Sequence, residues 1–567
     1  MAKMTGAQAL IESLKQQKVE VIFGISGGAL LPIHDVLYDS EIRHILARHE
    51  QGAVHAADGY ARASGRAGVC MATSGPGATN VVTGLANAYL DSSPVIALTG
   101  QVNTHSDNTS YMIGRDAFQE ADIIGITTPI TKYNVQVKTA AEIPNVVKKA
   151  FYIATTGRPG PALIDIPKDT QTGKAEMNFS ENLQLRGYKP NTDPHPLQIK
   201  KAVKLLLNAE RPMILAGGGV NLSNASPELL QLAELLMMPV ATTFMGKSCF
   251  PENNPLSIGN IGMHGTMVAN KMILEADVLL AVGTRFQDRA TGTLDDFCPD
   301  AIIIHIDVDA AEIGKNVAVK VPIVADAKQT LGLIYRQLIT KLKKKKDTPW
   351  VKRVKEAKEK FLSEVDLGQG DITSPKLLIE LRKILPENAI IATEVGQNQM
   401  WAALHFQTIK PRSFISSGGL GTMGFGFPAA IGAKVACPSC PVVDIAGDGS
   451  FRMTEQELGT SVTEDIPVIV IVLNNSMLGM VAQWQRMFYK NRYSGVKLGN
   501  VPDFSKLAQA YGAEGVRIGS LNEFSSAVKK ALKTEVTTVI DVPINPADDV
   551  FPMVPPGKGL KDTIAGR

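Results

Sequence analysis

The sequence lacks a strong excess of charge of one sign, because 58 Lys and Arg residues stand against 55 Asp and Glu residues and leave a net charge of +3. No electrostatic argument therefore favours nucleic acid or a membrane surface as a partner. Apolar runs long enough to span a membrane are also missing. The first residues enter a helical pattern by Thr5, with neither a signal peptide nor an Arg-rich transit segment. These absences predict a cytoplasmic protein.

Cysteine is scarce as well, with five residues that are scattered and cannot all pair, which favours a reducing compartment. Cys437 and Cys440 form the one CxxC spacing, within a turn. Without further ligands nearby, zinc binding and redox chemistry are not expected there.

Apolar strand-like runs alternate with amphipathic helical patterns over the 567 residues, which predicts an α/β fold with parallel sheets. Two polar stretches divide the chain. The first covers residues 170–196, and the second runs from the lysine-rich residues 341–346 through a charged helix to Gly370. Those lysines favour a solvated helix end over a phosphate-binding patch. The predicted units are residues 1–170, 197–340 and 374–545, followed by a Pro-rich tail at 546–567.

The most informative pattern lies where two strands of the third unit end. Residues 442–446 predict a buried strand leading to Asp448, and residues 466–473 predict another that leads to Asn475. Between them, residues 454–457 have capping-box spacing and should begin a helix. A right-handed crossover brings both strand ends to one edge of the sheet. One carboxylate and one amide there suit Mg²⁺, which keeps its other positions for water and the phosphates of a diphosphate.

In the first unit, Glu50 lies between a predicted strand, residues 42–48, and a predicted helix, residues 53–63. It either complements the helix dipole or acts as a general acid or base at the carboxyl end of a strand. Two Gly-rich turns, residues 24–28 and 74–80, also follow strand-like runs, so close approach of a ligand to their backbone is plausible.

The central unit begins with a strand, residues 212–216, that leads into three glycines and a helix. A second strand, residues 276–282, precedes Arg285 and Arg289, which are either surface charges or anion ligands. A third, residues 302–306, ends at Asp307, which suits ribose or ribityl hydroxyl groups. These features predict a dinucleotide site separate from the diphosphate site.

Residues 419–424 satisfy GxGxxG, lie between a predicted strand and helix, and precede Asp444 by twenty residues. A lone match of this kind is weak, and the metal–diphosphate pattern begins only four residues after Asp444. The loop therefore predicts a pocket wall that includes Met423 rather than an NAD site.

Several motifs carry a resemblance to a known family. They are RHEQGA at 48–53, TSGPGA at 73–78, DAFQE at 116–120, GRPGP at 157–161, GTRFQDRATG at 283–292, GTMGFG at 421–426, GDG at 447–449 and NN at 474–475. Together they resemble the thiamine-diphosphate enzymes, and among these the large catalytic subunits of biosynthetic, FAD-containing acetohydroxyacid (acetolactate) synthases. The resemblance runs from Thr5 to about residue 556. It implies three α/β domains of the pyruvate oxidase and decarboxylase type.

The resemblance also implies roles for residues. The metal ligands it implies are Asp448, Asn475 and the Met477 backbone carbonyl. Around the reacting centre it places Gly27, Glu50, Phe118, Gln119 and Lys168, with Glu50 bonded to the aminopyrimidine ring. The thiamine-diphosphate contacts it implies are Val395, Gly421, Met423, Gly447, Asp448, Gly449, Ser450, Asn475, Met477, Gly479 and Met480. The FAD contacts are Arg158, His264, Gly283, Thr284, Arg285, Asp307 and Asp326, and the substrate contacts are Met263, Arg289 and Trp484.

The reaction that the resemblance implies joins a pyruvate-derived hydroxyethyl unit on thiamine diphosphate to a second pyruvate or to 2-ketobutyrate, with release of CO₂. This is the first step of valine, leucine and isoleucine biosynthesis, a transferase (carboligase) reaction. The implied cofactors are thiamine diphosphate, Mg²⁺ and a structural, non-redox FAD. A homodimer or homotetramer with active sites between chains is also implied, together with a small regulatory subunit.

Two alternatives remain near this interpretation: an FAD-dependent pyruvate oxidase, and a catabolic acetolactate synthase without FAD. A cofactor-free structural relative is disfavoured by the intact Glu50, Asp448 and Asn475. The chain departs from the family pattern at GISGG, residues 24–28, and in a longer loop at 103–115 that borders the active site. Gln397-Asn398 also stands where a Gln-His pair is common.

Overall fold

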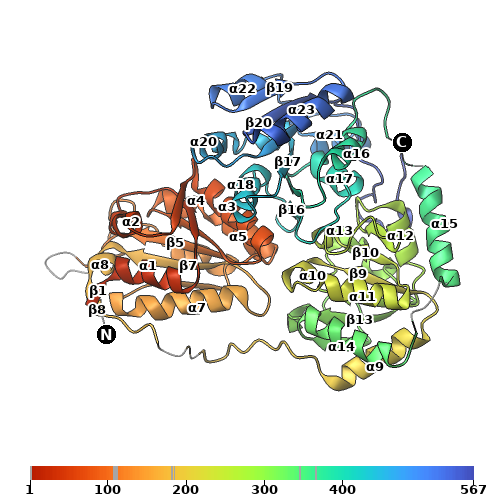
Figure 1. Ribbon diagram of the computed structural model, residues 1–567, viewed down its shortest axis with the longest axis horizontal. Coiled ribbons are helices and arrows are strands. Elements are labelled where there is room, and N and C mark those ends of the chain that lie inside the picture. The colour runs from red at the N-terminus through yellow and green to blue at the C-terminus, as the bar shows by residue number, and fades with distance from the viewer. Residues whose placement is uncertain are drawn as a thin grey trace.

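The computed structural model describes residues 3–105, 113–180, 183, 185–343, 347–363, 365 and 367–566. Three six-stranded sheets flanked by helices form three lobes, which follow one another along the chain (Figure 1). All neighbouring strands within these three sheets run parallel. The predicted α/β class with parallel sheets is therefore confirmed.

The first sheet has the strand order β3-β2-β4-β5-β7-β6. Its strands are β2 (Val21–Gly24), β3 (Arg43–Leu46), β4 (Gly68–Ala72), β5 (Val95–Gln101), β6 (Tyr133–Gln136) and β7 (Ala162–Pro167). Its helices are α1 (Gly6–Gln16), α2 (Leu31–Tyr38), α3 (Glu50–Ser64), α4 (Pro76–Asn80), α5 (Val82–Leu90), α6 (Ile123–Thr127), α7 (Ile143–Thr155) and α8 (Lys168–Thr172). The central strands are buried on both faces, which explains their nearly continuous apolar sequences.

The second sheet has the order β11-β10-β9-β12-β13-β14. Its strands are β9 (Pro212–Ala216), β10 (Val240–Thr242), β11 (Ser257–Asn260), β12 (Val278–Val282), β13 (Ile302–Asp307) and β14 (Val321–Val324). Its helices are α9 (Pro196–Asn208), α10 (Gly218–Leu222), α11 (Ser226–Leu236), α12 (Met267–Ile273), α13 (Asp288–Thr291), α14 (Ala327–Ile339) and α15 (Pro349–Ser363).

The third sheet has the order β16-β15-β17-β18-β20-β19. Its strands are β15 (Ile390–Thr393), β16 (Phe414–Ser416), β17 (Val442–Gly447), β18 (Ile469–Asn474), β19 (Glu514–Arg517) and β20 (Thr538–Pro543). Its helices are α16 (Ser374–Ile384), α17 (Gln397–His405), α18 (Gly426–Ala436), α19 (Asp448–Phe451), α20 (Leu458–Thr463), α21 (Gly479–Phe488), α22 (Phe504–Ala510) and α23 (Leu521–Thr534).

The first and third lobes meet through α3 and α18, which lie side by side at the centre of the molecule (Figure 1). A Cβ atom at Gly59 would lie 2.0 Å from the Ala429 carbonyl oxygen, and one at Gly432 would lie 1.8 Å from the Ala56 carbonyl oxygen. Only glycine allows such close contact between the two helix backbones. One hydrophobic core therefore extends across both lobes.

The first polar stretch begins later than the sequence pattern predicts. Residues 168–172 form α8, and β8 (Lys174–Glu176) pairs antiparallel with β1 (Lys3–Thr5). The two short strands close the first lobe at the chain's amino-terminal end. The long connection to the second lobe follows only after β8 (Figure 1).

The predicted capping box at residues 454–457 is wrong. Thr454 does not cap a helix with its side chain, and its hydroxyl group donates to the Gly424 carbonyl oxygen at 3.1 Å. The Glu457 carboxylate instead accepts backbone N–H bonds from Arg48 at 3.1 Å and from His49 at 2.9 Å, in the first lobe. A contact between residues about 400 positions apart thus takes the place of the local cap.

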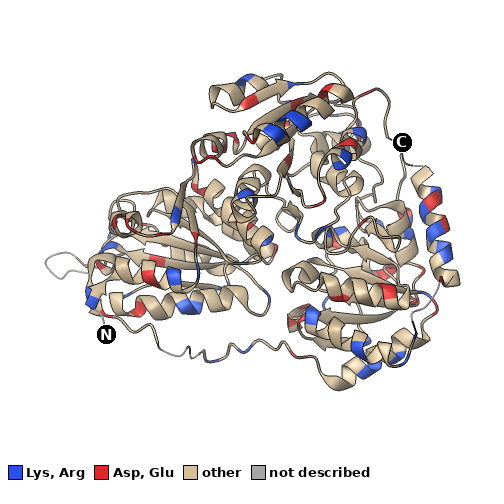
Figure 2. Cartoon of the chain, viewed as in Figure 1, with Lys and Arg blue, Asp and Glu red and all other residues tan. Residues whose placement is uncertain are grey.

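Cys437 and Cys440, the CxxC pair of the sequence, form a disulfide in the structure. Cys70, Cys249 and Cys298 are buried and free. Acidic and basic side chains are interspersed over the lobes and along α15, which is the charged helix expected after the lysine-rich residues (Figure 2). Of those lysines, residues 344–346 lie outside the described residues. No described helix is long and apolar enough to cross a membrane.

Candidate active site

The predicted metal ligands follow two neighbouring strands of the third sheet. β17 pairs with β18 so that Gly447 lies opposite Leu473. Asp448 begins α19 directly after β17, and Asn475 follows β18. Because both strands point the same way, the two side chains lie at one edge of the sheet. They are 3% and 8% exposed.

The electrostatics of Asp448 fit a cation. Burial raises the pKa of this carboxyl group to about 6, against the opposing effect of backbone N–H groups such as those of Asn475 and Ser476. No Lys, Arg or His of the described chain contributes a compensating charge. A divalent cation would supply that charge, since buried carboxylates are normally paired or coordinate metals.

The surrounding oxygen atoms fit Mg²⁺ in kind. Asn475 Oδ1 accepts a bond from the Met477 backbone N–H at 3.0 Å, and Asn475 Nδ2 donates to Gln397 Oε1 at 3.2 Å. These bonds fix the amide and leave one lone pair of Oδ1 free. Among the described residues no cluster of three or more His, Cys, Asp or Glu side chains could hold a metal ion. The candidate set is therefore one carboxylate, one amide and a backbone carbonyl, with phosphate and water as the remaining ligands.

The GxGxxG turn lies against the same site. The Val395 N–H donates to Ser450 Oγ at 3.4 Å, as does the Gly424 N–H at 3.1 Å. A Cβ atom at Gly449 would lie 3.9 Å from the Met423 terminal methyl group. The turn and Met423 therefore lie beside the α19 turn that carries Asp448.

Sequence reasoning missed Glu394, which organises this wall. Its fully buried carboxylate accepts bonds from the Gly424 N–H at 2.8 Å, the Phe427 N–H at 3.0 Å and the Ser450 hydroxyl at 2.6 Å. Burial raises its pKa. The available signal was its position directly after β15, which is the same strand-end placement that identified Asp448.

Gln397 and Asn398, which the sequence analysis named without a role, also lie at this edge. Asn398 Nδ2 donates to the carbonyl oxygens of Glu394 at 2.8 Å and Ile445 at 2.7 Å, and so joins the ends of β15 and β17. Gln397 contacts Asn475, as described above. A Cβ atom at Gly479 would lie 2.1 Å from Gln397 Oε1 and 2.5 Å from Asn475 Nδ2, so a larger residue there would displace these two amides. Amide side chains in a helical pattern give no sequence signal of such a role.

A cavity of about 940 Å³ lies between the lobes, and every residue predicted to bind FAD or substrate lines it. These residues are Arg158, Met263, His264, Gly283, Thr284, Arg285, Arg289, Asp307, Asp326 and Trp484, and the predicted thiamine-diphosphate contacts Val395, Gly421 and Met480 line it as well. The volume lies at the upper end of the range for ligand pockets.

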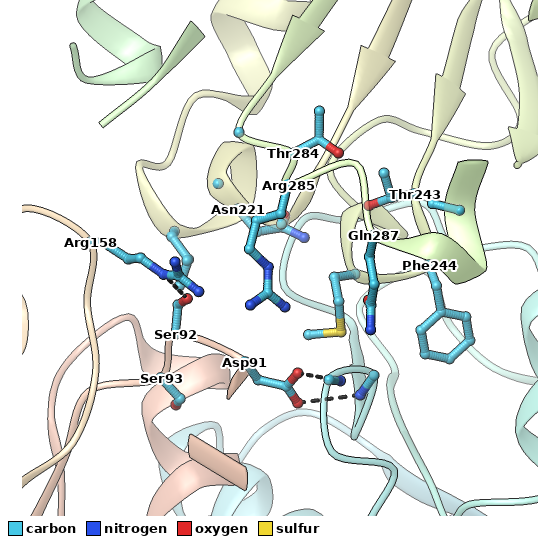
Figure 3. A pocket seen from close by; sticks show the side chains of 18 of the residues that line it. Asp91, Ser92, Ser93, Arg158, Asn221, Thr243, Phe244, Thr284, Arg285 and Gln287 are labelled. Atoms are coloured by element: carbon cyan, nitrogen blue, oxygen red, sulfur yellow. Dashed lines mark hydrogen bonds between the residues drawn. The ribbon is translucent and has the colours of Figure 1, made fainter. Parts of the chain in front are cut away.

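Two of the arginines that line the cavity, Arg158 and Arg285, differ in their hydrogen bonding (Figure 3). Arg158 donates to Ser92 Oγ at 2.9 Å and to Glu312 at 2.7 Å. The Arg285 guanidinium group has no hydrogen bond or ion pair with any residue that the structure describes, and burial and the nearby Arg158 lower its pKa. Its guanidinium group points into the centre of the cavity and is available to an anion (Figure 3).

The remaining polar groups fit a dinucleotide such as FAD. Burial raises the pKa of Asp307, at the end of β13, to about 6. Within the described chain, His264 Nε2 and Asn221 Oδ1 are buried and lack hydrogen-bond partners. The cavity thus offers an unpaired cation for phosphate and unpaired polar atoms for hydroxyl or ring groups. Asp326 also lines it but accepts a bond from the Gln329 N–H at 2.9 Å as the cap of α14.

One end of the cavity holds the three predicted substrate residues. The Arg289 guanidinium carbon lies 6.0 Å from the centre of the Trp484 ring. Arg289 Nη1 lies 4.0 Å from Met263 Sδ. Its closest carboxylate, that of Asp288, is 4.0 Å away, so Arg289 is free to bind a carboxylate ligand.

The catalytic residues predicted in the first lobe form a separate group. Glu50 begins α3 and accepts a bond from Asn80 Nδ2 at 2.9 Å. A Cβ atom at Gly27 would lie 2.5 Å from the Thr73 side chain, and one at Gly75 would lie 2.9 Å from Gln119. These residues therefore surround the turn at 73–77. Lys168 begins α8 at the carboxyl end of β7.

None of the first-lobe residues Gly27, Glu50, Phe118, Gln119 and Lys168 lines the cavity. Phe118 is 86% exposed, so its ring is largely uncovered by the residues that the structure describes. Of the predicted long loop at 103–115, residues 106–112 lie outside the described part of the chain.

Comparisons with known proteins agree with these three lobes. Models of the thiamine pyrophosphate enzymes match the chain with their N-terminal TPP binding domain at residues 4–126, central domain at 199–334 and C-terminal TPP binding domain at 394–542. A probable acetolactate synthase large subunit of Methanocaldococcus jannaschii is 53% identical over 99% of this chain and 95% of its own. The acetolactate synthase large subunits of Corynebacterium glutamicum and Haemophilus influenzae are 46% and 43% identical, over 99% and 100% of this chain and 90% and 99% of their own.

Proposed function

The chain belongs to the thiamine pyrophosphate enzyme family, among the acetolactate synthase large subunits, and from this membership we propose that it condenses two 2-keto acids with loss of CO₂. Pyruvate would give 2-acetolactate, and pyruvate with 2-ketobutyrate would give 2-aceto-2-hydroxybutyrate. One observation carries the proposal: α21 joins the Asp448–Asn475 site to the cavity. It begins at Gly479, beside Asn475, and carries Trp484 into the cavity about 7.5 Å further along its axis.

Thiamine diphosphate binding follows from the family, and we assign the diphosphate and Mg²⁺ to Asp448, Asn475 and Met477. Gly447, Gly449, Ser450, Gly479 and Met480 lie on the adjoining turns and complete this assignment. When bound, thiamine diphosphate supplies the electron sink for decarboxylation of a 2-keto acid. The chain's own contribution is to hold the cation and to exclude water from a buried edge of the sheet.

Arg289 and Trp484 are assigned to the second substrate. The Arg289 guanidinium group binds the carboxylate of the incoming keto acid through charge-assisted hydrogen bonds. Trp484 forms a flat apolar wall beside it. Glu50 holds a proton on its carboxyl group for the aminopyrimidine ring, with Asn80 fixing the orientation of the carboxyl group.

FAD is assigned to the cavity as a structural cofactor held by Arg158 and Arg285. The oxidase alternative differs in that flavin would take electrons from pyruvate, and the catabolic alternative would need no flavin at all. The Arg289 carboxylate site favours the synthase, because an oxidase has no second keto acid to bind.

The test is product analysis with pyruvate and 2-ketobutyrate together, with thiamine diphosphate and Mg²⁺, with and without FAD. Both acetohydroxyacids should form, and FAD should be required without being bleached by pyruvate alone. Rapid bleaching would identify an oxidase. Full activity of a colourless protein would identify the catabolic type.

Substitution of Trp484 by leucine should reduce the preference for 2-ketobutyrate over pyruvate about tenfold, since a methylene group packed against a pocket wall contributes about 1–3 kcal/mol. Competition between the two acceptors measures the product ratio. Tyr489→Leu, at an exposed position one residue beyond α21, is the control and should leave the ratio unchanged. An unaltered ratio in W484L would remove Trp484 from this role.

We propose a homo-oligomer in which the Glu50 group of one chain faces the Asp448 site of its partner. Two features support this assembly: the first-lobe group lies away from the cavity, and Phe118 is exposed. The name large subunit, which the relatives carry, supports a small regulatory subunit as a further partner. A cytoplasmic location completes the proposal.

A further inference from the structure

A chain of buried amides links the proposed Mg²⁺ site to the C-terminal segment. Gln397 accepts from Asn475 Nδ2, and its own Nε2 donates to Gln483 Oε1 at 2.9 Å and to the Asp548 carbonyl oxygen at 3.0 Å. Gln397 and Gln483 are 4% and 0% exposed. Only the Gln397 side chain therefore separates the proposed metal ligand Asn475 from residue 548.

The Gln483 side chain both donates a hydrogen bond to the C-terminal segment and accepts one from it. Its Nε2 donates to the Val550 carbonyl oxygen at 3.1 Å, and the Val550 N–H donates to its Oε1 at 2.9 Å. One turn further along α21, Arg486 pairs with the nearly buried Asp549 carboxylate. Helix α21 thus contacts residues 549 and 550 through Gln483 and Arg486, and it also contributes Trp484 to the cavity lining.

The other end of this segment contacts the second lobe at the substrate pocket. The Val554 N–H donates to the Met263 carbonyl oxygen at 2.7 Å, and His264 Nδ1 lies 3.2 Å from the Pro552 carbonyl oxygen. Residues 548–554, which we call the strap, therefore run from the Gln397–Gln483 pair to Met263.

The strap can influence Asn475 because the buried Gln397 amide is hydrogen-bonded on both sides. Its Oε1 accepts from Asn475, and its Nε2 donates to Gln483 and to the Asp548 carbonyl oxygen. Loss of Gln483 would leave the Gln397 Nε2 group with one buried partner instead of two. A buried donor that lacks a partner is costly, so Gln397 would turn away from Asn475.

We propose that Gln483 is a positioning residue, through which docking of the strap orients Asn475 for Mg²⁺ and at the same time fixes Met263 in the substrate pocket. This inference rests on the proposed function, because it takes Asp448 and Asn475 as the metal site. Metal binding and strap order then favour each other, and such coupling acts equally in both directions.

In the first experiment, Mg²⁺ is titrated into the full chain in the presence of thiamine diphosphate, and binding is measured by calorimetry. Gln483→Met keeps the side-chain volume but removes the hydrogen bonds to Gln397 and Val550, together with the weaker ones to the sulfur atoms of Met487 and Met553. We expect it to raise the Mg²⁺ concentration at half-saturation about 10- to 100-fold, the range for groups that orient metal ligands. A half-saturation concentration within twofold of that of the unaltered chain would overturn the inference.

Gln171→Met is the matched control. Gln171 is also 0% exposed, and its Nε2 donates to the carbonyl oxygens of Ala29 at 2.7 Å and Ile166 at 2.8 Å, far along the chain from the metal site. The Gln171→Met variant should lose about as much folding stability as Gln483→Met. Its Mg²⁺ concentration at half-saturation should equal that of the unaltered chain. An equal rise in both variants would reduce Gln483 to a structural role and overturn the inference.

A second measurement uses the unaltered chain and does not depend on the folding of a variant. Hydrogen exchange of the Val550 and Val554 N–H groups should slow at least threefold when Mg²⁺ and thiamine diphosphate are added together. Unchanged exchange with both ligands bound would overturn the coupling and leave the proposed function intact. Failure to bind thiamine diphosphate with Mg²⁺ would overturn the proposed function, and this inference with it.

Discussion

Substitution of Glu50 by glutamine is expected to lower the rate of acetolactate formation by about 10²- to 10⁴-fold, the range typical of a positioned general acid or base. Glutamine keeps the size of the side chain and can still accept the bond from Asn80, now 2.9 Å from Glu50 Oε2. What it loses is the ability to hold and release a proton. Steady-state rates with pyruvate measure the loss, and calorimetry with thiamine diphosphate should show that binding persists.

A simpler role for Glu50 predicts a different result. As the first residue of α3, its carboxylate complements the positive end of the helix dipole. Were this its only role, Glu50→Gln would cost less than about 1 kcal/mol of stability and leave the rate nearly unchanged. Glu20→Gln, which breaks an exposed pair with Arg66, controls for the loss of an ordinary surface carboxylate. A rate within threefold of normal in E50Q would exclude proton transfer by this residue.

The strand pattern was sufficient to predict the edge of the third sheet. Asp448 and Asn475 each follow a buried apolar run, and parallel strands bring such positions together whatever the details of the loops. The same reasoning applies to Asp307 and Arg285 in the second sheet. Glu394 met the same criterion but was overlooked, because a single acidic residue after a strand is common.

Other features depend on contacts that a local pattern does not contain. Glu457 has the spacing of a helix cap, yet its carboxylate binds backbone N–H groups of residues 48 and 49 in another lobe. Gln397 and Gln483 are uncharged helical residues whose role appears only when residues 548–550 lie against them. Glycine at 59 and 432 is explained only once α3 meets α18.

Substitution of Asp448 by asparagine is expected to abolish the stabilisation of the protein by Mg²⁺ and thiamine diphosphate together. A ligand at 100 times its dissociation constant stabilises the folded chain by about 2.7 kcal/mol. Removing the one carboxylate of the site should weaken Mg²⁺ binding by roughly 100-fold or more, since even groups that only orient ligands contribute 10- to 100-fold. The ligand-dependent rise in Tm should then disappear, and turnover with it.

Without ligands, the same substitution is not expected to lower the unfolding temperature. This difference between the two conditions distinguishes a metal ligand from a structural residue. Burial already disfavours the charged form of Asp448, and no positive side chain in the described residues offsets that charge. A neutral amide of the same shape removes this penalty, so D448N should unfold at the same temperature as the unaltered chain, or higher, when no metal is present. Asp444→Asn, a fully buried carboxyl group in β17 whose pKa burial raises well above its usual value, is the matched control. It should retain the Mg²⁺-dependent rise. If D448N were destabilised without ligand and still responded to Mg²⁺, Asp448 would be a structural residue and the metal site would lie elsewhere.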